Sequence, residues 1–356
     1  GTLTVTIAAA STNATFAIDG SGDVVVTNVT GCSGSYDPTT DTTMEVLVET
    51  SGSNETVTFV DAANTDWPAT VEVDLGDGTD DRIVLQGTAG DDTFSTSDPV
   101  DTATDVEHWS LYGLGGADTL SGTDTDDLLD GGTGDDVLWG YEGNDTIAGG
   151  SGSGVDTIYA GYGDDTVTGG DGNDEIWGWY GDDTIDAGSG DDMVVGDAAT
   201  IVFFGVPDGF DRSTAPARRL SAIDTLTPSV GGADDITAGS GDDVVVGGLD
   251  GDTITGDDGD DVLVGDYADL VFALAVAADR SFLVSLTSVS EGQGGDDSIT
   301  GGDGGSLVPI AAFARACAAI AAWSDNPEER RDALALAERA AWMVYGTHRG
   351  GRLPTV

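Results

Sequence analysis

Aspartate residues recur at a fixed spacing through the middle of this chain, and the spacing indicates metal chemistry. From Gly113 to Val195 the sequence follows a nine-residue pattern, Gly-Gly-x-Gly-x-Asp-x-U-x, where U is a large aliphatic residue and one unit has eleven residues. We number the places of each unit from one to nine. A carboxylate is a hard oxygen ligand, and a hard cation such as Ca²⁺ takes about six to eight oxygens. The sixth place is therefore the candidate ligand position.

Tight turns and very short strands must position these aspartates. Glycine at the first, second and fourth places permits backbone angles that other residues avoid. The eighth place is always aliphatic, as at Leu120 and Ile147, which indicates a buried row. A strand of about three residues cannot bury its apolar face alone, so successive turns must stack at the strand spacing of ~4.8 Å. Stacking places identical aspartates in columns, where bare carboxylates repel one another and a bound cation removes the repulsion.

Calcium suits this all-oxygen ligand set. Magnesium demands stricter octahedral geometry, while zinc and copper favour histidine or cysteine. The only such residues, His108, His348, Cys32 and Cys317, lie outside the repeat units. The candidate calcium ligands are the sixth-place aspartates of all units, including outlying ones: Asp92, Asp118, Asp127, Asp136, Asp145, Asp156, Asp165, Asp174, Asp183, Asp192, Asp234, Asp243, Asp252, Asp261 and Asp297.

The nonapeptide resembles the RTX, or haemolysin-type, calcium-binding repeat, whose units form a parallel β-roll. The resemblance implies two units per coil, with several calcium ions held between consecutive turns on each side. On this chain it implies two alternating columns. One would hold Asp118, Asp136, Asp156, Asp174 and Asp192, and the other Asp127, Asp145, Asp165 and Asp183.

Changes in composition predict an N-terminal β-rich region (1–86), a β-roll (87–305) and a C-terminal helical hairpin (306–356). The first part alternates valine and threonine with polar turns, as β-strands do, and caps or extends the solenoid. The repeats are interrupted at 197–230 and 266–291 by two similar segments, which we expect to be duplicated hairpins. We therefore predict an all-β fold: a parallel β-roll, or β-solenoid, with an N-terminal β region, two hairpin-like insertions and a small α-hairpin.

The C-terminal segment is rich in alanine and arginine. Two helices are predicted, separated by a stop and a proline at the first turn of the second helix. By its position, the hairpin fits the uncleaved type I secretion signal that the resemblance implies. It equally fits a cap on the open end of the solenoid, and docking onto a neighbouring subunit is a third possibility.

Aromatic residues gather at one corner of the predicted coils. They occupy the ninth place of every second unit and the places just after it. An aromatic stripe on an acidic scaffold is either covered by another part of the chain or is a contact surface for self-assembly or for sugar rings. The residues are Trp139, Tyr141, Tyr159, Tyr162, Trp177, Trp179 and Tyr180.

The composition restricts compartment and partners. A net charge of −55, from 66 acidic residues against 11 basic ones, all arginine, opposes compaction unless cations bind. Free calcium is plentiful outside cells, so we expect a secreted, extracellular or cell-surface protein. Nucleic-acid binding needs a basic footprint, which is lacking. No stretch reaches the ~18–20 apolar residues of a transmembrane segment. Sequons such as Asn28-Val29-Thr30 permit glycosylation without requiring it.

Catalytic arrangements are not recognisable in the sequence. It contains no His-Glu-x-x-His and no Gly-x-Ser-x-Gly elbow, and its glycine runs lack the lysine of a phosphate loop. We therefore expect no enzyme but a calcium-binding structural protein of an extracellular filament, surface layer, matrix or adhesin. One alternative is the C-terminal secretion and folding module of a larger type I-secreted enzyme or toxin. Another is a carbohydrate-binding module using the aromatic edge.

Overall fold

The computed structural model describes residues 2–7, 13–18, 24–27, 43–48, 56–60, 62, 70–75, 81–97, 100, 102–104, 106–197, 199–203, 220–225, 231–259, 261–266, 268–275, 280–288 and 298–300. These residues contain β-strands throughout, as the all-β prediction requires. The predicted α-hairpin and Asp297 lie outside them. The chain divides into two compact units, Gly1–Thr184 and Ile185–Val356, and each is described by itself. Within the described part, no helix has the length and hydropathy to cross a membrane.

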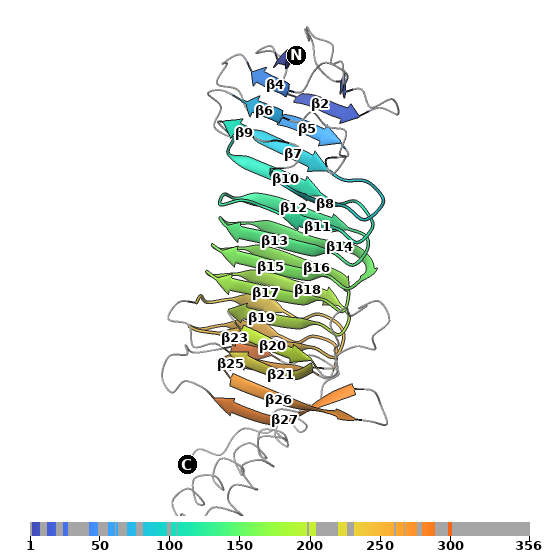
Figure 1. Cartoon of the computed structure of the whole chain (residues 1–356). Helices are drawn as coiled ribbons and strands as arrows, with labels where there is room; N and C mark the ends of the chain where they lie inside the picture. The colour runs from blue at the N-terminus through green and yellow to red at the C-terminus, as the bar shows by residue number, and fades with distance from the viewer. Residues whose placement is uncertain are drawn as a thin grey trace, which may run out of the picture. The chain divides into compact units, whose positions relative to one another are not determined.

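The first unit is a stack of coils in which the chain passes from one sheet to another (Figure 1). Strands of neighbouring coils pair in parallel, and β3 adds to β2 in antiparallel orientation. The first sheet contains, in order, β3 (Val24–Thr27), β2 (Asn13–Ile18), β5 (Thr56–Val60), β7 (Arg82–Gln86), β10 (His108–Tyr112), β12 (Asp127–Gly132), β14 (Thr146–Gly154) and β16 (Thr166–Gly172). The second contains β8 (Thr93–Ser95), β11 (Thr119–Ser121), β13 (Val137–Glu142), β15 (Thr157–Tyr162) and β17 (Glu175–Tyr180). A third contains β1 (Thr2–Ile7), β4 (Thr43–Val48), β6 (Thr70–Asp74) and β9 (Thr102–Thr104).

The eighth-place aliphatic residues form the core of the coils. Leu120 pairs in register with Leu138, which pairs with Ile158 in the second sheet. Leu129 and Ile147 pair in the same way in the first sheet. All five are 0–1% exposed. Their burial confirms the predicted role of the eighth place. Burial of each such side chain contributes about 1.5–3 kcal/mol to stability.

The N-terminal strands extend the same sheet as the repeats. Strands β5, β7, β10 and β12 are all parallel, so Phe59, Leu85 and Leu111 continue the buried column that Leu129 occupies. Phe16 stacks on Phe59, with ring centroids 5.3 Å apart. The N-terminal region therefore extends the roll, in coils that are longer than those of the nonapeptides.

The second unit repeats this parallel pairing on a smaller scale. Its strands pair as β19–β23–β25 and as β22–β24–β28. Their bounds are β19 (Met193–Asp197), β22 (Asp235–Thr237), β23 (Val244–Gly248), β24 (Thr253–Thr255), β25 (Val262–Asp266) and β28 (Ser298–Thr300), and β18 (Thr184–Ser189) spans the division between the units.

The two insertions are hairpins that pair with each other. Strands β20 (Ala199–Phe203) and β21 (Leu220–Thr225) form the first antiparallel hairpin, and β26 (Ala268–Ala275) and β27 (Arg280–Ser288) form the second. Antiparallel pairing of β21 with β26 joins them into one four-stranded sheet. The duplicated hairpins expected from the sequence are thus present, and each covers an edge of the other.

Candidate metal centre

The sixth-place aspartates form hydrogen-bonded columns on both sides of the first unit. Most lie directly before a strand, and Asp127 begins one. After the first aspartate of each column, Oδ1 accepts a hydrogen bond from the backbone N–H of the aspartate one coil earlier. In one column the distances from Asp118 N to Asp136 and from Asp136 N to Asp156 are 2.7 and 2.9 Å. In the other, the distance from Asp127 N to Asp145 is 2.8 Å. The two-sided alternation is confirmed.

The remaining candidates in the described residues follow the same pattern. Asp92, from the isolated unit, joins the first column by donating to Asp118 at 2.7 Å. Within the second unit, Asp192 donates to Asp243 and Asp234 donates to Asp252, at 2.6 and 3.0 Å. The further members of these columns are Asp165, Asp174, Asp183 and Asp261.

The second carboxylate oxygen, Oδ2, is left without a partner in the central coils. In Asp118, Asp136, Asp145 and Asp165 this atom is buried and accepts no hydrogen bond. A buried acceptor without a partner costs about 1–3 kcal/mol, and more when it is charged. Each of these Oδ2 atoms therefore needs a cation or a hydrogen-bond donor to offset the cost of its burial.

Backbone carbonyl oxygens share the space in front of these Oδ2 atoms. A Cβ added to Gly131 would collide with both Asp136 Oδ2 and the Gly149 carbonyl oxygen of the next coil. At Gly140 the same hypothetical atom would meet Asp145 Oδ2 and the Ala160 carbonyl oxygen. Only glycine leaves this space open, and its walls carry oxygen atoms. This donor set fits a calcium ion.

Across the described residues, no group of three or more His, Cys, Asp or Glu side chains converges as a metal cluster would. The oxygen atoms around the first-place glycines belong to Oδ2 and to backbone carbonyls, and a cation in the columns would take its ligands from both. The first-place glycines keep the space between these oxygens open.

Burial gives these carboxyls unusual pKa values. Burial raises the pKa of Asp145 and Asp156 to about 8, and that of Asp165 to about 7, against hydrogen bonds from the backbone that lower it. Burial likewise raises the pKa of Asp136 to about 6. Neighbouring carboxylates contribute to the higher pKa of all four. A divalent cation would favour the ionised form, because it attracts the charges that otherwise repel.

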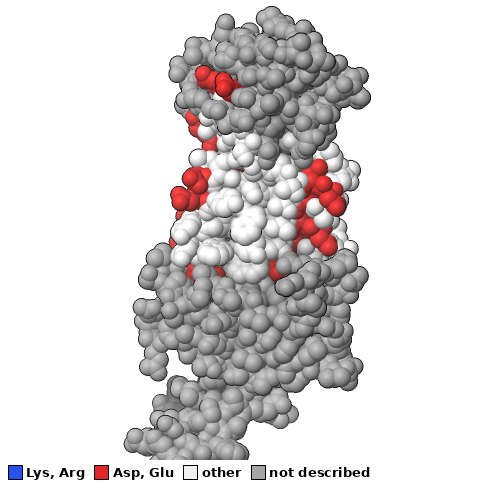
Figure 2. Space-filling model, in the orientation of Figure 1, with Lys and Arg blue, Asp and Glu red and all other residues white. Residues whose placement is uncertain are grey.

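Sequence reasoning missed a second, exposed ladder at the fifth place. Asp126 Oδ1 accepts from Asn144 N at 2.8 Å, and Asn144 Oδ1 accepts from Asp164 N at 3.0 Å, so this ladder runs in the opposite direction along the coils. Paired aspartates in most units were its signal. Figure 2 shows acidic side chains along both margins of the visible face. Asp197, buried in the second unit, was also missed because it lies where the repeat pattern stops.

The predicted aromatic corner is brought together on β13, β15 and β17. Trp139, Tyr159 and Trp177 stack in register, with centroids 4.0 and 4.7 Å apart, and Tyr162 stacks on Tyr180 at 4.5 Å. Tyr141 lies beside Trp139, and Trp179 beside Tyr180. Tyr141 and Tyr162 are 49% and 54% exposed, whereas Trp177 is buried. Tyr159 therefore has a ring on each side, whereas Tyr162 stacks on one ring only.

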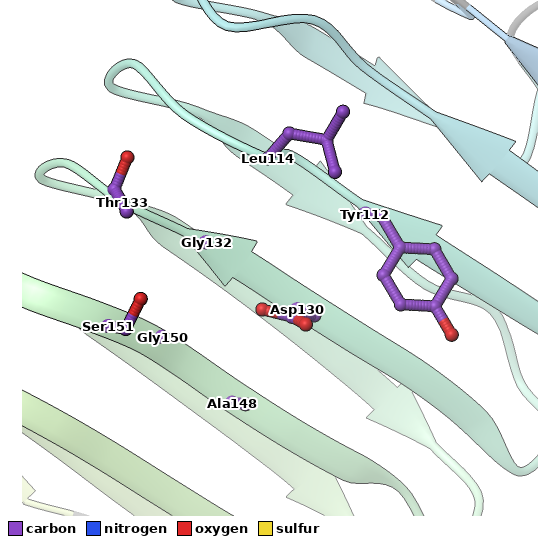
Figure 3. A pocket seen from close by; sticks show the side chains of 8 residues that line it. All are labelled: Tyr112, Leu114, Asp130, Gly132, Thr133, Ala148, Gly150 and Ser151. Atoms are coloured by element: carbon purple, nitrogen blue, oxygen red, sulfur yellow. The ribbon is translucent and has the colours of Figure 1, made fainter.

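A shallow groove of about 450 Å³ crosses β10, β12 and β14 (Figure 3). Glycine and alanine form part of its lining, which leaves room beside larger neighbours. Burial raises the pKa of Asp130 within it. The lining residues are Tyr112, Leu114, Asp130, Gly132, Thr133, Ala148, Gly150 and Ser151.

Parallel coils with a stacked aliphatic core and buried aspartate ladders define a β-roll of the cation-binding class. The family model described as the RTX calcium-binding nonapeptide repeat matches this chain in four copies, at residues 121–156, 151–179, 159–194 and 230–266. The chain therefore carries RTX calcium-binding repeats, which imply calcium binding by the ladders and are typical of type I-secreted proteins. Asp92 and Asp118 lie outside the matched residues but belong to the same hydrogen-bonded column. Curated proteins and solved structures gave no significant match.

Proposed function

We propose that this is a secreted, non-catalytic structural protein whose roll is folded and stiffened by calcium outside the cell. It would serve as a subunit of an extracellular filament, surface layer, matrix or adhesin. The observation that carries this proposal is the set of buried Oδ2 atoms that face carbonyl oxygens and lack a partner. Calcium then acts as a structural component, because binding and folding are linked.

Charge supports an extracellular role. A net charge of −55 would expand the chain in the absence of bound cations. Extracellular fluids contain far more free calcium than the cell interior. The same chain would be extended before export and compact after it, which suits type I secretion. The predicted secretion signal in residues 306–356 lies outside the described residues and stays a proposal.

The aromatic corner is the surface we propose for contact between subunits. The rings of Trp139, Tyr159 and Trp177 stack on one another, and the most exposed parts of the corner are the rings and hydroxyls of Tyr141 and Tyr162. Aromatic edges with a polar tip are common in protein interfaces. This geometry favours packing against another protein surface over stacking on a sugar ring.

Negative-stain electron microscopy with millimolar calcium, and then with chelator, tests the proposal. We expect ordered filaments or sheets with calcium alone. The variant Tyr141→Ser with Tyr162→Ser should prevent assembly while keeping the calcium-dependent circular dichroism signal. Thr166→Ser with Thr168→Ser, exposed on the first sheet, is the matched control. Single particles in both conditions would favour the alternative, a secretion and folding module of a larger enzyme or toxin.

Carbohydrate binding is a second candidate, favoured by the groove. Tyr112 offers an aromatic ring, and Asp130, Thr133 and Ser151 offer hydrogen-bonding groups around a glycine-lined floor. A glycan array read with wild-type protein and with Tyr112→Ala tests it. Binding that is lost in the variant would support this function, and no binding by the wild type would reject it.

A further inference from the structure

We infer that Thr88 and Thr123 close the two aspartate columns at their N-terminal ends by taking the place of a cation at the first carboxylate. The inference rests on calcium binding by the other rungs. The inference divides the predicted calcium-binding aspartates into those whose Oδ2 is capped by threonine and those whose Oδ2 is not. Asp92 and Asp127 are self-capped at Oδ2, and the aspartates that follow them require an ion there.

Both threonines hydrogen bond in the same way. Asp92 Oδ2 accepts from Thr88 N at 2.6 Å and from Thr88 Oγ1 at 2.9 Å. Asp127 Oδ2 accepts from Thr123 N at 2.6 Å and from Thr123 Oγ1 at 2.8 Å. Each threonine lies at the second place of its unit, four residues before the aspartate. Asp127 Oδ1 is buried without a hydrogen bond, so the cap concerns Oδ2 alone.

Later units lack this cap because the second place has the opposite backbone conformation. The residues there have φ of +77° at Leu114, +103° at Gly132, +83° at Tyr141 and +127° at Gly161. In the aspartates of these four units, Asp118, Asp136, Asp145 and Asp165, the Oδ2 atom accepts no hydrogen bond. Thr88 and Thr123 are not among the described residues with positive φ. A β-branched residue strongly disfavours positive φ, so threonine here selects the capped conformation.

The caps occur only where a column begins. Asp92 precedes β8, which is the end strand of the second sheet. Asp127 pairs in register with Trp109, and Trp109 pairs with Ile83, so the positions before it are apolar and buried. No other sixth-place aspartate of the described residues has threonine at its second place. Threonine thus occupies the second place only at the N-terminal ends of the two columns in the described residues, which supports its role in ending them.

A consequence follows for folding. The coils N-terminal to the columns are held by an apolar core that includes Phe59, Leu85 and Leu111, and the first carboxylate of each column already has donors. Order should therefore persist without calcium up to about the capped aspartates. The calcium-dependent coils would then fold one after another on these ordered strands, as the units of a repeat protein do.

Hydrogen exchange and calcium counting on the full chain test the inference. In chelator, we expect amides of 82–86 and 108–112 to stay protected while those of 137–142 and 157–162 exchange at least tenfold faster. Thr88→Gly with Thr123→Gly should lose the protection at 108–112 by at least tenfold. Equilibrium dialysis with the metal alone should then find at least one more calcium per chain, because two Oδ2 atoms become available.

Matched variants separate the cap from general destabilisation. Thr88→Ser with Thr123→Ser keeps both donors and should behave as wild type. Thr133→Gly makes the same change at an exposed third place and should leave the calcium count unaltered. If the glycine variant does not fold, Thr123→Val, which removes only the hydroxyl, should reduce protection at 108–112. Wild-type protection and calcium count in both the glycine and valine variants would overturn the inference while leaving calcium binding intact. A wild-type chain that binds no calcium would overturn both.

Discussion

Beyond the first aspartate of each column, a sixth-place aspartate such as Asp136 uses its two oxygens differently. Oδ1 links two coils by accepting a backbone N–H, and such a bond to a charged group contributes about 1.5–3 kcal/mol. Oδ2 remains buried without a partner in residues such as Asp136 and Asp145, at a penalty of similar size. The two effects nearly cancel. An ion at Oδ2 would remove the penalty and leave the link, so we expect bound calcium to stabilise the ladder.

Asp145→Asn should weaken the calcium response and stabilise the metal-free roll. The amide keeps an acceptor for Asp127 N, but it removes a buried charge that is repelled by Asp165 and Asp127. We expect a higher calcium midpoint in a circular dichroism titration, together with more β signal in chelator. Asp164→Asn, in the exposed fifth-place ladder, is the control. Equal midpoints for both variants would contradict this role of Oδ2.

Without calcium, the roll should be more stable in acid than at neutral pH. Burial raises the pKa of Asp136 to about 6 and the pKa of Asp145 and Asp156 to about 8, from 3.8. The folded state then binds more protons than the unfolded state between about pH 4 and 8, so the free energy of unfolding falls as pH rises through this window. Thermal melts in chelator across that range should give a Tm that decreases with pH. A Tm that increases would show that these carboxyls are ionised in the metal-free fold.

At the scale of the turn, the second place accepts large residues in a strained conformation. Tyr141 has φ +83° and aligns in register with Gly161, which has φ +127°. A left-handed conformation costs a residue with a Cβ about 1–2 kcal/mol. The strand therefore carries an aromatic ring where glycine would fit with less strain, and stability alone does not explain its presence. The contact role proposed for this exposed ring would account for it.

Tyr141→Gly and Gly161→Ala should differ sharply. The first relieves about 1–2 kcal/mol of strain and loses about 0.5–1.5 kcal/mol of aromatic contact, so unfolding in calcium should change by less than about 1 kcal/mol. The second places a Cβ against the Tyr141 carbonyl oxygen and should destabilise by about 1–3 kcal/mol. Denaturant unfolding in saturating calcium measures both. A strongly destabilising Tyr141→Gly would show that the ring serves the fold.

The sequence predicted the features that repeat and missed those that do not. The eighth-place core follows from periodicity, and Asp92 could be assigned from one isolated unit. The division of the aspartates into two columns came from the resemblance to the RTX repeat. The parallel pairing of Phe59 with Leu85 could not, because alternating residues fit parallel and antiparallel strands equally. The pairing of β21 with β26 was also out of reach, since a hairpin pattern does not encode its partner. The Thr123 cap depends on the sign of one φ angle, which the consensus does not specify.

For the molecule as a whole, calcium and magnesium should have different effects. Both ions screen a net charge of −55. The candidate calcium sites, however, are lined by aspartate Oδ2 atoms and by backbone carbonyl oxygens whose positions the coils fix. Calcium accepts such irregular geometry at about 2.3–2.6 Å, while magnesium demands a tighter octahedron and retains water. We expect millimolar magnesium to leave the chain expanded in small-angle scattering and calcium to compact it. Equal compaction by both ions would indicate charge screening without site binding.

Aspartates of one column are 18 residues, or two units, apart. The roll therefore keeps its two sides distinct only when it lengthens by an even number of units. The eleven-residue unit is absorbed by a shift between Gly150 and Ser153, and its partners are 20 residues apart without changing column. A hairpin insertion leaves the partners Asp192 and Asp243 51 residues apart and still in register. Duplication of a single nonapeptide, in contrast, would transfer every later aspartate and aromatic residue to the opposite side. Gain or loss of two units would keep each later aspartate and aromatic residue on its side of the roll. Gain or loss of one unit would keep the fold but move these residues to the opposite side.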